Sequence, residues 1–168
     1  MPYSDESAAN KVNPQDDTQT IFMSINENTS SFHIKQADAD ITLPVGFEMI
    51  SNKYFKHTPP TYDDIEYAIN YIEDEIEKVV PLIRADNTTL VSNNSFIRTF
   101  ALLSGAQDAA EVLLQRDDLE YLFGQYAEIA MGRPPRPHET DISPLFYAKL
   151  LIFREFMHHL KFDHILIK

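Results

Sequence analysis

The sequence has no cysteine, no secretory signal and no long apolar run. The absence of cysteine from its 168 residues excludes disulfide bonds, thiolate metal ligands and a cysteine nucleophile. The first residues lack the basic start and apolar core of a secretory signal, and no later run approaches the ~20 apolar residues that cross a bilayer. We therefore expect a soluble, cytoplasmic protein with no membrane contact.

Motifs that identify an activity are also missing. Only 4 glycines occur, and none belongs to a phosphate-binding loop of the Walker type or to a GxSxG nucleophile elbow. The HExxH zinc motif and the ligand spacing of an EF-hand are absent as well. The sequence accordingly predicts no cofactor and assigns no reaction.

Positive charge is scarce, above all in the first half of the chain. The formal net charge is −12, and residues 1–90 account for −10 of it, with 6 Lys and Arg against 16 Asp and Glu. A surface of this sign repels phosphate backbones and anionic lipids, which disfavours ordinary nucleic-acid binding. The plain interpretation of the charge is solubility, and the specific one is a basic protein partner.

What the sequence does contain is enough apolar material for one core. Hydrophobic residues make up 43% of the chain, with 11 Phe and 8 Tyr, which argues against global disorder. We expect a mobile polar leader over residues 1–19 and a single α+β domain over residues 20–168. This domain should contain an N-terminal antiparallel sheet, about four helices, a buried C-terminal helix, and a short final strand that returns to the sheet.

Local patterns place these elements along the chain. Apolar or alternating runs predict strands at residues 20–25, 32–36, 41–50, 90–91 and 162–167. Apolar residues at helical spacing predict helices at residues 61–80, 107–115, 117–131 and 144–161. Residues 94–104 fit a strand or a helix, and we favour the helix.

The stretch from Ser143 to Lys168 is the predicted centre of the fold. Ser143 can cap a helix with its hydroxyl, and Pro144 suits the first helical position, where no backbone N–H is needed. A narrow polar stripe carries Arg154 and His158, and apolar side chains cover most of the remaining helix surface. Such a helix must be buried on several sides.

The helix predicted at residues 61–80 carries seven acids against one cation, Lys78. Thr61 and Asp64 resemble a capping box at its start. The acids from Glu73 to Glu77 lie near the negative end of the helix dipole, where each costs about a few tenths of a kcal/mol. A solvated face explains them, and the alternatives are a docking surface for a cationic partner or a cation-binding site.

The densest group of ionisable side chains lies near the C-terminus. A carboxylate four residues before a histidine can orient the imidazole as a general base, or the two can bind a metal. Glu155 and His159 are therefore the candidate pair, with His158 as a further catalytic candidate and His164 as a further metal candidate. The plainer interpretation is a hydrogen-bonded structural pair.

Candidate ligand-binding residues lie elsewhere. Arg133, Arg136 and His138 fall in a proline-rich connection, and arginine suits a carboxylate or a phosphate. Arg98 is a further candidate, beside the C-terminal group. These arginines are also the expected ion-pair partners of the chain's many acids.

Three functions remain open on the sequence alone. The leading hypothesis is a non-catalytic accessory or regulatory module that binds protein and self-associates, because acids are abundant and no catalytic motif is present. The alternative is a small enzyme or ligand-binding domain with an acid/base or metal site around Glu155 and His159. Mimicry of nucleic acid by the acidic helix is disfavoured because one helix is too short for it.

Overall fold

The protein folds around a six-stranded sheet of mixed strand direction. The computed structural model describes residues 18–168, and over this range the sheet order is β3-β2-β1-β4-β6-β5. The strands are β1 (Gln19–Ile25), β2 (Ser30–Ile34), β3 (Ala39–Leu43), β4 (Thr88–Ser92), β5 (Val112–Gln115) and β6 (His164–Ile167). The α-helices are α2 (Phe47–Tyr54), α3 (Tyr62–Glu77), α4 (Ser95–Leu103), α5 (Arg116–Ala130) and α6 (Pro144–His159). The predicted α+β class is confirmed.

Strand direction divides the sheet into two parts. β1, β2 and β3 form the predicted antiparallel meander. β4 is parallel to β1 and β6 is parallel to β4, while β5 pairs antiparallel with β6 at the edge. The sheet is thus not purely antiparallel, because helices carry the chain back across it before β4 and β6. β6 confirms the predicted return of the C-terminal strand.

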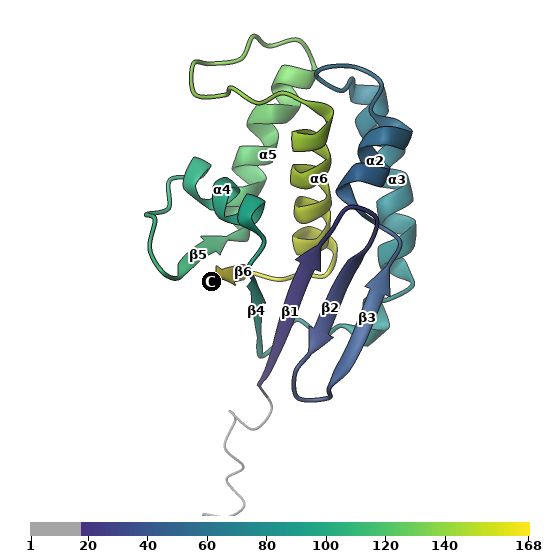
Figure 1. Ribbon diagram of the computed structural model, residues 1–168, viewed down its shortest axis with the longest axis vertical. Coiled ribbons are helices and arrows are strands. Elements are labelled where there is room, and N and C mark those ends of the chain that lie inside the picture. The colour runs from purple at the N-terminus through teal and green to yellow at the C-terminus, as the bar shows by residue number, and fades with distance from the viewer. Residues whose placement is uncertain (1–17) are drawn as a thin grey trace, which may run out of the picture.

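Helix α6 is the centre of the helical layer, as predicted. Figure 1 shows it between α5 on one side and α2 with α3 on the other, and it contacts all of these helices. The Ser143 hydroxyl accepts a hydrogen bond from the Phe146 N–H at 3.1 Å, and Pro144 occupies the first turn. Phe153 and Phe156 are fully buried. These contacts account for the wide apolar surface of this helix.

Residues 41–50 do not form the single extended segment that was predicted. The chain leaves β3 at Leu43 and begins α2 at Phe47. Gly46 permits this change, since a Cβ there would lie 2.3 Å from the Glu27 carbonyl oxygen in the turn between β1 and β2. The close approach of two backbone segments therefore decides the structure here.

Residues 107–115 are not a helix either, because their last four residues form β5. Val112 and Leu114 are buried, while Leu113 and Gln115 between and after them are exposed. Pairing with β6 across the sheet edge fixes this alternation. Residues 94–104 do contain the favoured helix, α4.

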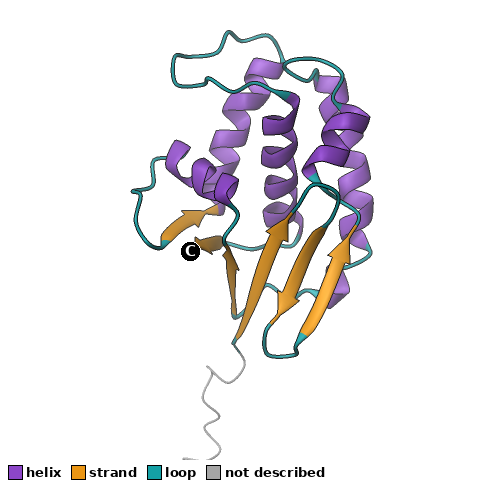
Figure 2. Cartoon of the chain, in the orientation of Figure 1, coloured by secondary structure: helices purple, strands orange, loops and turns teal. Residues whose placement is uncertain are grey.

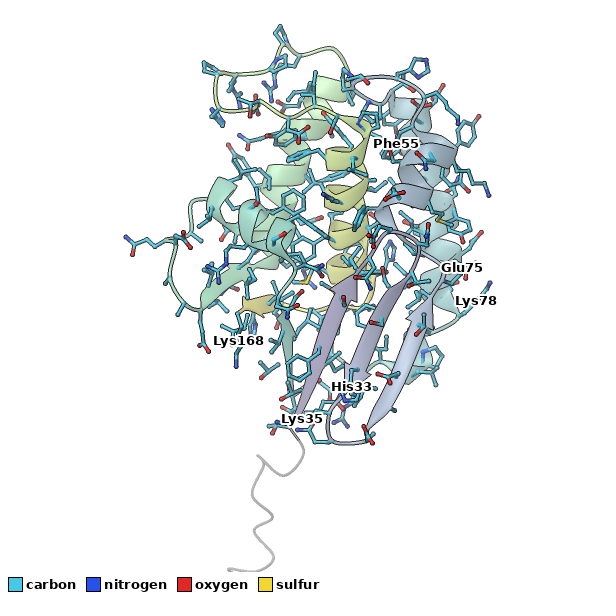
Figure 3. All side chains as sticks on the ribbon, viewed as in Figure 1. His33, Lys35, Phe55, Glu75, Lys78 and Lys168 are labelled. Atoms are coloured by element: carbon cyan, nitrogen blue, oxygen red, sulfur yellow. The ribbon has the colours of Figure 1, made fainter. Side chains whose placement is uncertain are left out.

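Helix α3 keeps its predicted start and its acidic face. The Thr61 hydroxyl accepts from the Asp64 N–H at 3.1 Å, and the Asp64 carboxylate accepts from the Thr61 N–H at 3.2 Å, which completes the capping box. Lys78 lies beside Glu75 at the end of the helix, with its Nζ donating at 2.9 Å (Figure 3). Lys78 is the single lysine against the seven acids of this helix region.

Two expectations concern the limits of the chain. The predicted leader, residues 1–19, lies largely outside the described residues, and both its mobility and the single-domain boundary stay predictions. Within residues 18–168, no helix is long and apolar enough to cross a membrane.

Candidate functional site

Helix α6 presents Glu155 and His159 to helix α3, where they meet Glu73. Glu155 and His159 are one helical turn apart, so both side chains lie on one face. His159 Nε2 lies 2.8 Å from Glu73 Oε2 and 3.2 Å from Glu155 Oε1. The three ligand atoms all lie within 4.8 Å of one another. We call this group the Glu73–Glu155–His159 cluster.

Glu155 is the most deeply buried member, with 0% of its surface exposed. The Arg154 Nη1 donates to Glu155 Oε2 at 2.6 Å, whereas Oε1 has no hydrogen-bond partner among the described residues. The approach of His159 to Oε1 lacks hydrogen-bond geometry despite its short distance. Burial raises the pKa of Glu155, although Arg154 opposes the shift. A proton or a cation at Oε1 would relieve the cost of this unpaired oxygen.

Glu73 is the member of the cluster that the sequence did not pair with α6. Glu73 lies 86 residues before His159. Its carboxylate belongs to the acidic helix face that the sequence analysis explains as solvent-exposed. The available signal was the run of acids at the negative end of α3, where Lys78 is the single lysine against four acids between Glu73 and Glu77. The run of acids indicates an unusual local charge, but it does not predict that Glu73 contacts Glu155 and His159.

The other histidines predicted for this region lie outside the cluster. His158 is half exposed, and its Nδ1 lies 4.0 Å from Glu120 Oε1. Burial and the nearby Arg154 both lower the pKa of His158. His164, the further metal candidate from the sequence, lies on β6 opposite Gln115. The third member of the cluster is Glu73 instead.

Arg98 holds a loop and does not reach the cluster. Its Nη1 donates to Asp108 Oδ1 at 2.9 Å and to the Ala109 carbonyl oxygen at 2.7 Å. Its Nη2 donates to the Ala110 carbonyl oxygen at 3.2 Å. These bonds fasten the segment that precedes β5.

Arg133 closes the proline-rich connection between α5 and α6, which lies at the end of the helical layer away from the strands (Figure 2). Its two Nη atoms donate to the two carboxylate oxygens of Glu139 at 3.0 and 2.9 Å. The Arg136 N–H adds a third bond to Glu139 at 2.7 Å. Hydrogen bonding by Arg133 is the main cause that lowers the pKa of Glu139 to about 2. His138 and the Arg136 side chain are exposed on the same loop.

A second candidate site lies near the start of α6. A cavity of about 290 Å³ opens beside the first turns of α4 and α6. Its polar lining consists of Ser95, Thr99, Asp141, Ser143 and Lys149. The Lys149 Nζ lies 4.9 Å and 5.3 Å from the ring centroids of Phe47 and Phe96. We call this space the Lys149 cavity, and no sequence prediction pointed to it.

The Lys149 cavity lies beyond the carboxyl ends of the parallel strands β1 and β4. Asn94, two residues after the end of β4, accepts a hydrogen bond from the Ile25 N–H at 2.9 Å and donates to the Ile25 carbonyl oxygen at 3.0 Å. Its side chain therefore joins the ends of β1 and β4 and does not cap α4. The Glu73–Glu155–His159 cluster lies at the opposite end of the strands, because α3 and α6 end shortly before β4 and β6 begin.

Comparison with known proteins gave matches only among solved structures. No protein family model and no curated protein matches the sequence. The structure of an Aquifex aeolicus Ppx/GppA phosphatase, a type II variant, matches 96% of this chain with a TM-score of 0.71 at 18% sequence identity. The fold resembles that of the Ppx/GppA phosphatases. An exopolyphosphatase from Cytophaga hutchinsonii matches 95% of this chain with a TM-score of 0.67 at 16% identity.

These matches correct the leading hypothesis from the sequence. The predicted non-catalytic, protein-binding module is contradicted, because the solved structures compared above are those of Ppx/GppA phosphatases and an exopolyphosphatase. The alternative, a small enzyme or ligand-binding domain, agrees better with them. The chain covers 56% of the length of the Aquifex aeolicus and Cytophaga hutchinsonii proteins. The prediction was wrong because it relied on the absence of known catalytic motifs. A fold fixes the arrangement of helices and strands, and proteins can share it without sharing such motifs.

Proposed function

We propose that this chain is a domain of a phosphatase-type enzyme and holds the phosphate groups of its substrate in the Lys149 cavity. The observation that carries the proposal is the agreement of the fold with a Ppx/GppA phosphatase over 96% of the chain. Because the chain spans 56% of that protein, phosphate binding is the first property to expect of this domain alone.

The direction of the strands favours the Lys149 cavity over the Glu73–Glu155–His159 cluster as the substrate site. In open sheets with parallel strands, ligands bind beyond the carboxyl ends of the strands. β1 and β4 are parallel and end beside Asn94, at the edge that carries the Lys149 cavity. The cluster lies at the amino ends of these strands, where this rule places no substrate.

The lining of the Lys149 cavity suits a phosphate group. Lys149 offers an ammonium group, which its position over two aromatic rings helps to keep in place. Ser95 and Ser143 offer hydroxyl donors, whereas the Thr99 hydroxyl donates to the Ser95 carbonyl oxygen at 3.3 Å. Because the net charge of −12 repels phosphate over most of the surface, binding depends on this local cation.

Asp141 is the carboxylate in the same cavity and is our candidate for the general base. In hydrolysis, a water oxygen attacks phosphorus, the bond from phosphorus to the leaving oxygen breaks, and Asp141 accepts the proton of the water. Lys149 offsets the negative charge on the transferred phosphoryl group. Substrate binding and proton transfer are thus assigned to different residues.

Calorimetric titration with tripolyphosphate tests the binding step. Lys149→Met should weaken binding at least about tenfold, because the cation of the site is lost. Lys53→Met is the matched control, since its Nζ also lies over two rings, those of Tyr54 and Tyr71, each at 5.4 Å. Equal affinities of the two variants, or no binding by the unaltered protein, would contradict the proposal.

Phosphate release from tripolyphosphate tests the hydrolytic step. Asp141→Asn should lower the rate by about a hundredfold and leave the affinity for tripolyphosphate unchanged or higher. A rate that Asp141→Asn does not change would remove Asp141 from the proposed mechanism. The predicted self-association, basic protein partner and cytoplasmic location are separate from these tests and stay predictions.

A further inference from the structure

We propose that Glu73, Glu155 and His159 bind one divalent transition-metal cation, for which Zn²⁺ matches the donor set best. This inference goes beyond the proposed phosphatase function and does not depend on it. His159 follows Lys149 by ten residues on α6, so the two sites are about 15 Å apart along the helix. The metal site and the phosphate site would therefore be separate.

The arrangement of donor atoms suits such an ion. One imidazole nitrogen and two carboxylate oxygens form a mixed set that zinc binds readily, with a fourth position left for water. Ligand atoms about 2.0–2.2 Å from a tetrahedral zinc lie roughly 3.3–3.6 Å from one another. His159 Nε2 already lies 2.8 Å from one carboxylate oxygen and 3.2 Å from the other. Small side-chain rotations would complete the geometry.

The unpaired oxygen of Glu155 independently points to a ligand. Its Oε1 is buried, has no hydrogen-bond partner among the described residues, and lies 3.2 Å from His159 Nε2. A buried carboxylate oxygen without a partner costs free energy, and a metal ion would satisfy it directly. A purely structural hydrogen bond between Glu73 and His159 does not account for this oxygen.

The charges around the cluster leave room for a divalent cation. Arg154 donates through its Nε to both carboxylate oxygens of Glu120, at 2.8 and 2.9 Å, and through its Nη1 to Glu155 Oε2 at 2.6 Å, so two carboxyl groups share its single positive charge. Glu73 and Glu155 bring two carboxyl groups together beside His159. One divalent cation would neutralise the two carboxylates.

The cluster is open to solvent on one side. The side chains of His159 and Glu73 are 34% and 38% exposed, whereas that of Glu155 is 0% exposed. A cavity of about 410 Å³ borders Glu73 and His159, and Asp74 and Glu77 also line it. This acidic entrance attracts cations and gives an ion a path to the buried ligand. It also provides the water for the fourth coordination position.

Metal binding at this position would connect two helices. Glu73 is on α3 and the other two ligands are on α6, which is the central helix of the fold. An ion that binds only the folded state stabilises it by mass action. We therefore expect the melting temperature to rise with the concentration of free Zn²⁺.

The test is a titration of chelator-treated protein with Zn²⁺, followed by calorimetry and by thermal melting. The unaltered protein should bind one ion per chain and melt at a higher temperature. Glu73→Gln removes a ligand charge on a partly exposed side chain and should weaken binding at least tenfold. Glu77→Gln is the matched control, because Glu77 lines the same cavity one helical turn away. Its affinity should stay within twofold of the unaltered protein.

Two outcomes would overturn the metal site. Equal weakening in Glu73→Gln and Glu77→Gln would mean that the acidic surface attracts cations without a defined site. The absence of both Zn²⁺ binding and a melting shift would mean that Glu73 and His159 form a hydrogen bond only. Neither outcome bears on phosphate binding at Lys149.

Discussion

Two buried glutamates, Glu139 and Glu155, lie at opposite ends of the helical layer and differ in almost everything except burial. Glu139 is 3% exposed and accepts three hydrogen bonds, two from Arg133 and one from the Arg136 N–H. Glu155 is 0% exposed, accepts one hydrogen bond from Arg154, and has an unpaired oxygen. The pKa is lowered in the first residue and raised in the second.

The difference separates a structural carboxylate from one that is available to a ligand. Donors surround Glu139 on both oxygens, so its charge is stabilised and its contribution is to close the loop before α6. Glu155 is supported on one side only, and its second oxygen faces His159 and Glu73. Burial alone therefore does not indicate function, whereas incomplete hydrogen bonding of a buried charge does.

The largest effect on stability should come from Glu139→Gln. The substitution keeps the shape of the side chain but turns an amide N–H₂ toward the donors of Arg133, so the free energy of unfolding should fall by about 2 kcal/mol. Urea unfolding followed by circular dichroism measures it. A loss below about 0.5 kcal/mol would show that the loop does not depend on this ion pair.

Glu139 should also make the stability of the protein depend on pH. Because the pKa of Glu139 falls from 4.5 in the unfolded chain to about 2 in the folded protein, the unfolded state binds the proton more readily. The contribution of the Glu139 carboxylate to the free energy of unfolding is complete above pH 4.5 and is lost as the pH falls toward 2. Melting temperatures between pH 6 and pH 2 should decline less steeply in Glu139→Gln. Parallel curves for the two proteins would contradict this assignment.

A smaller effect is expected from Glu155→Gln. Removing a charge that is buried and half satisfied should change the free energy of unfolding of the metal-free protein by less than about 1 kcal/mol, with a gain in stability as one expected result. The same urea titration measures the change. If Glu155→Gln destabilised the protein as much as Glu139→Gln does, the contrast between the two glutamates would be lost.

The smallest effect is expected from Glu128→Gln. Glu128 accepts from Arg133 Nε at 2.8 Å, but its side chain is 58% exposed. Exposed ion pairs are worth little, so the free energy of unfolding should change by less than about 0.5 kcal/mol. This variant is the control for Glu139→Gln, since both remove a carboxylate partner of Arg133. Equal losses in the two variants would mean that burial does not matter here.

Much of the fold could be predicted because local signals agree with it. The cap at Ser143, the capping box of Thr61 with Asp64, and the apolar surface of α6 all lie within single elements. The start of α2 could not be read, because it depends on the approach of Gly46 to Glu27. The strand at residues 112–115 depends likewise on pairing with β6.

The candidate sites were predictable only in part. The spacing of Glu155 and His159 on one helix is visible in the sequence, and the structure does bring these residues together. Glu73 comes from a helix far away in sequence, so no spacing rule could add it. Lys149 is the only lysine of α6, a largely apolar helix that also carries Arg154, and the cavity around Lys149 exists only after α4 and α6 pack.

The most direct test of the proposed function is to follow the backbone amide signals of ¹⁵N-labelled protein by NMR while tripolyphosphate is added. We predict that the largest shifts fall in the first turns of α4 and α6 and around Lys149. A second cavity with cationic side chains makes the result decisive, because Arg116, His158 and Lys161 line it together with Asp117, Glu120 and His159. Shifts confined to that second cavity, or none at all, would contradict the assignment of phosphate to the Lys149 cavity.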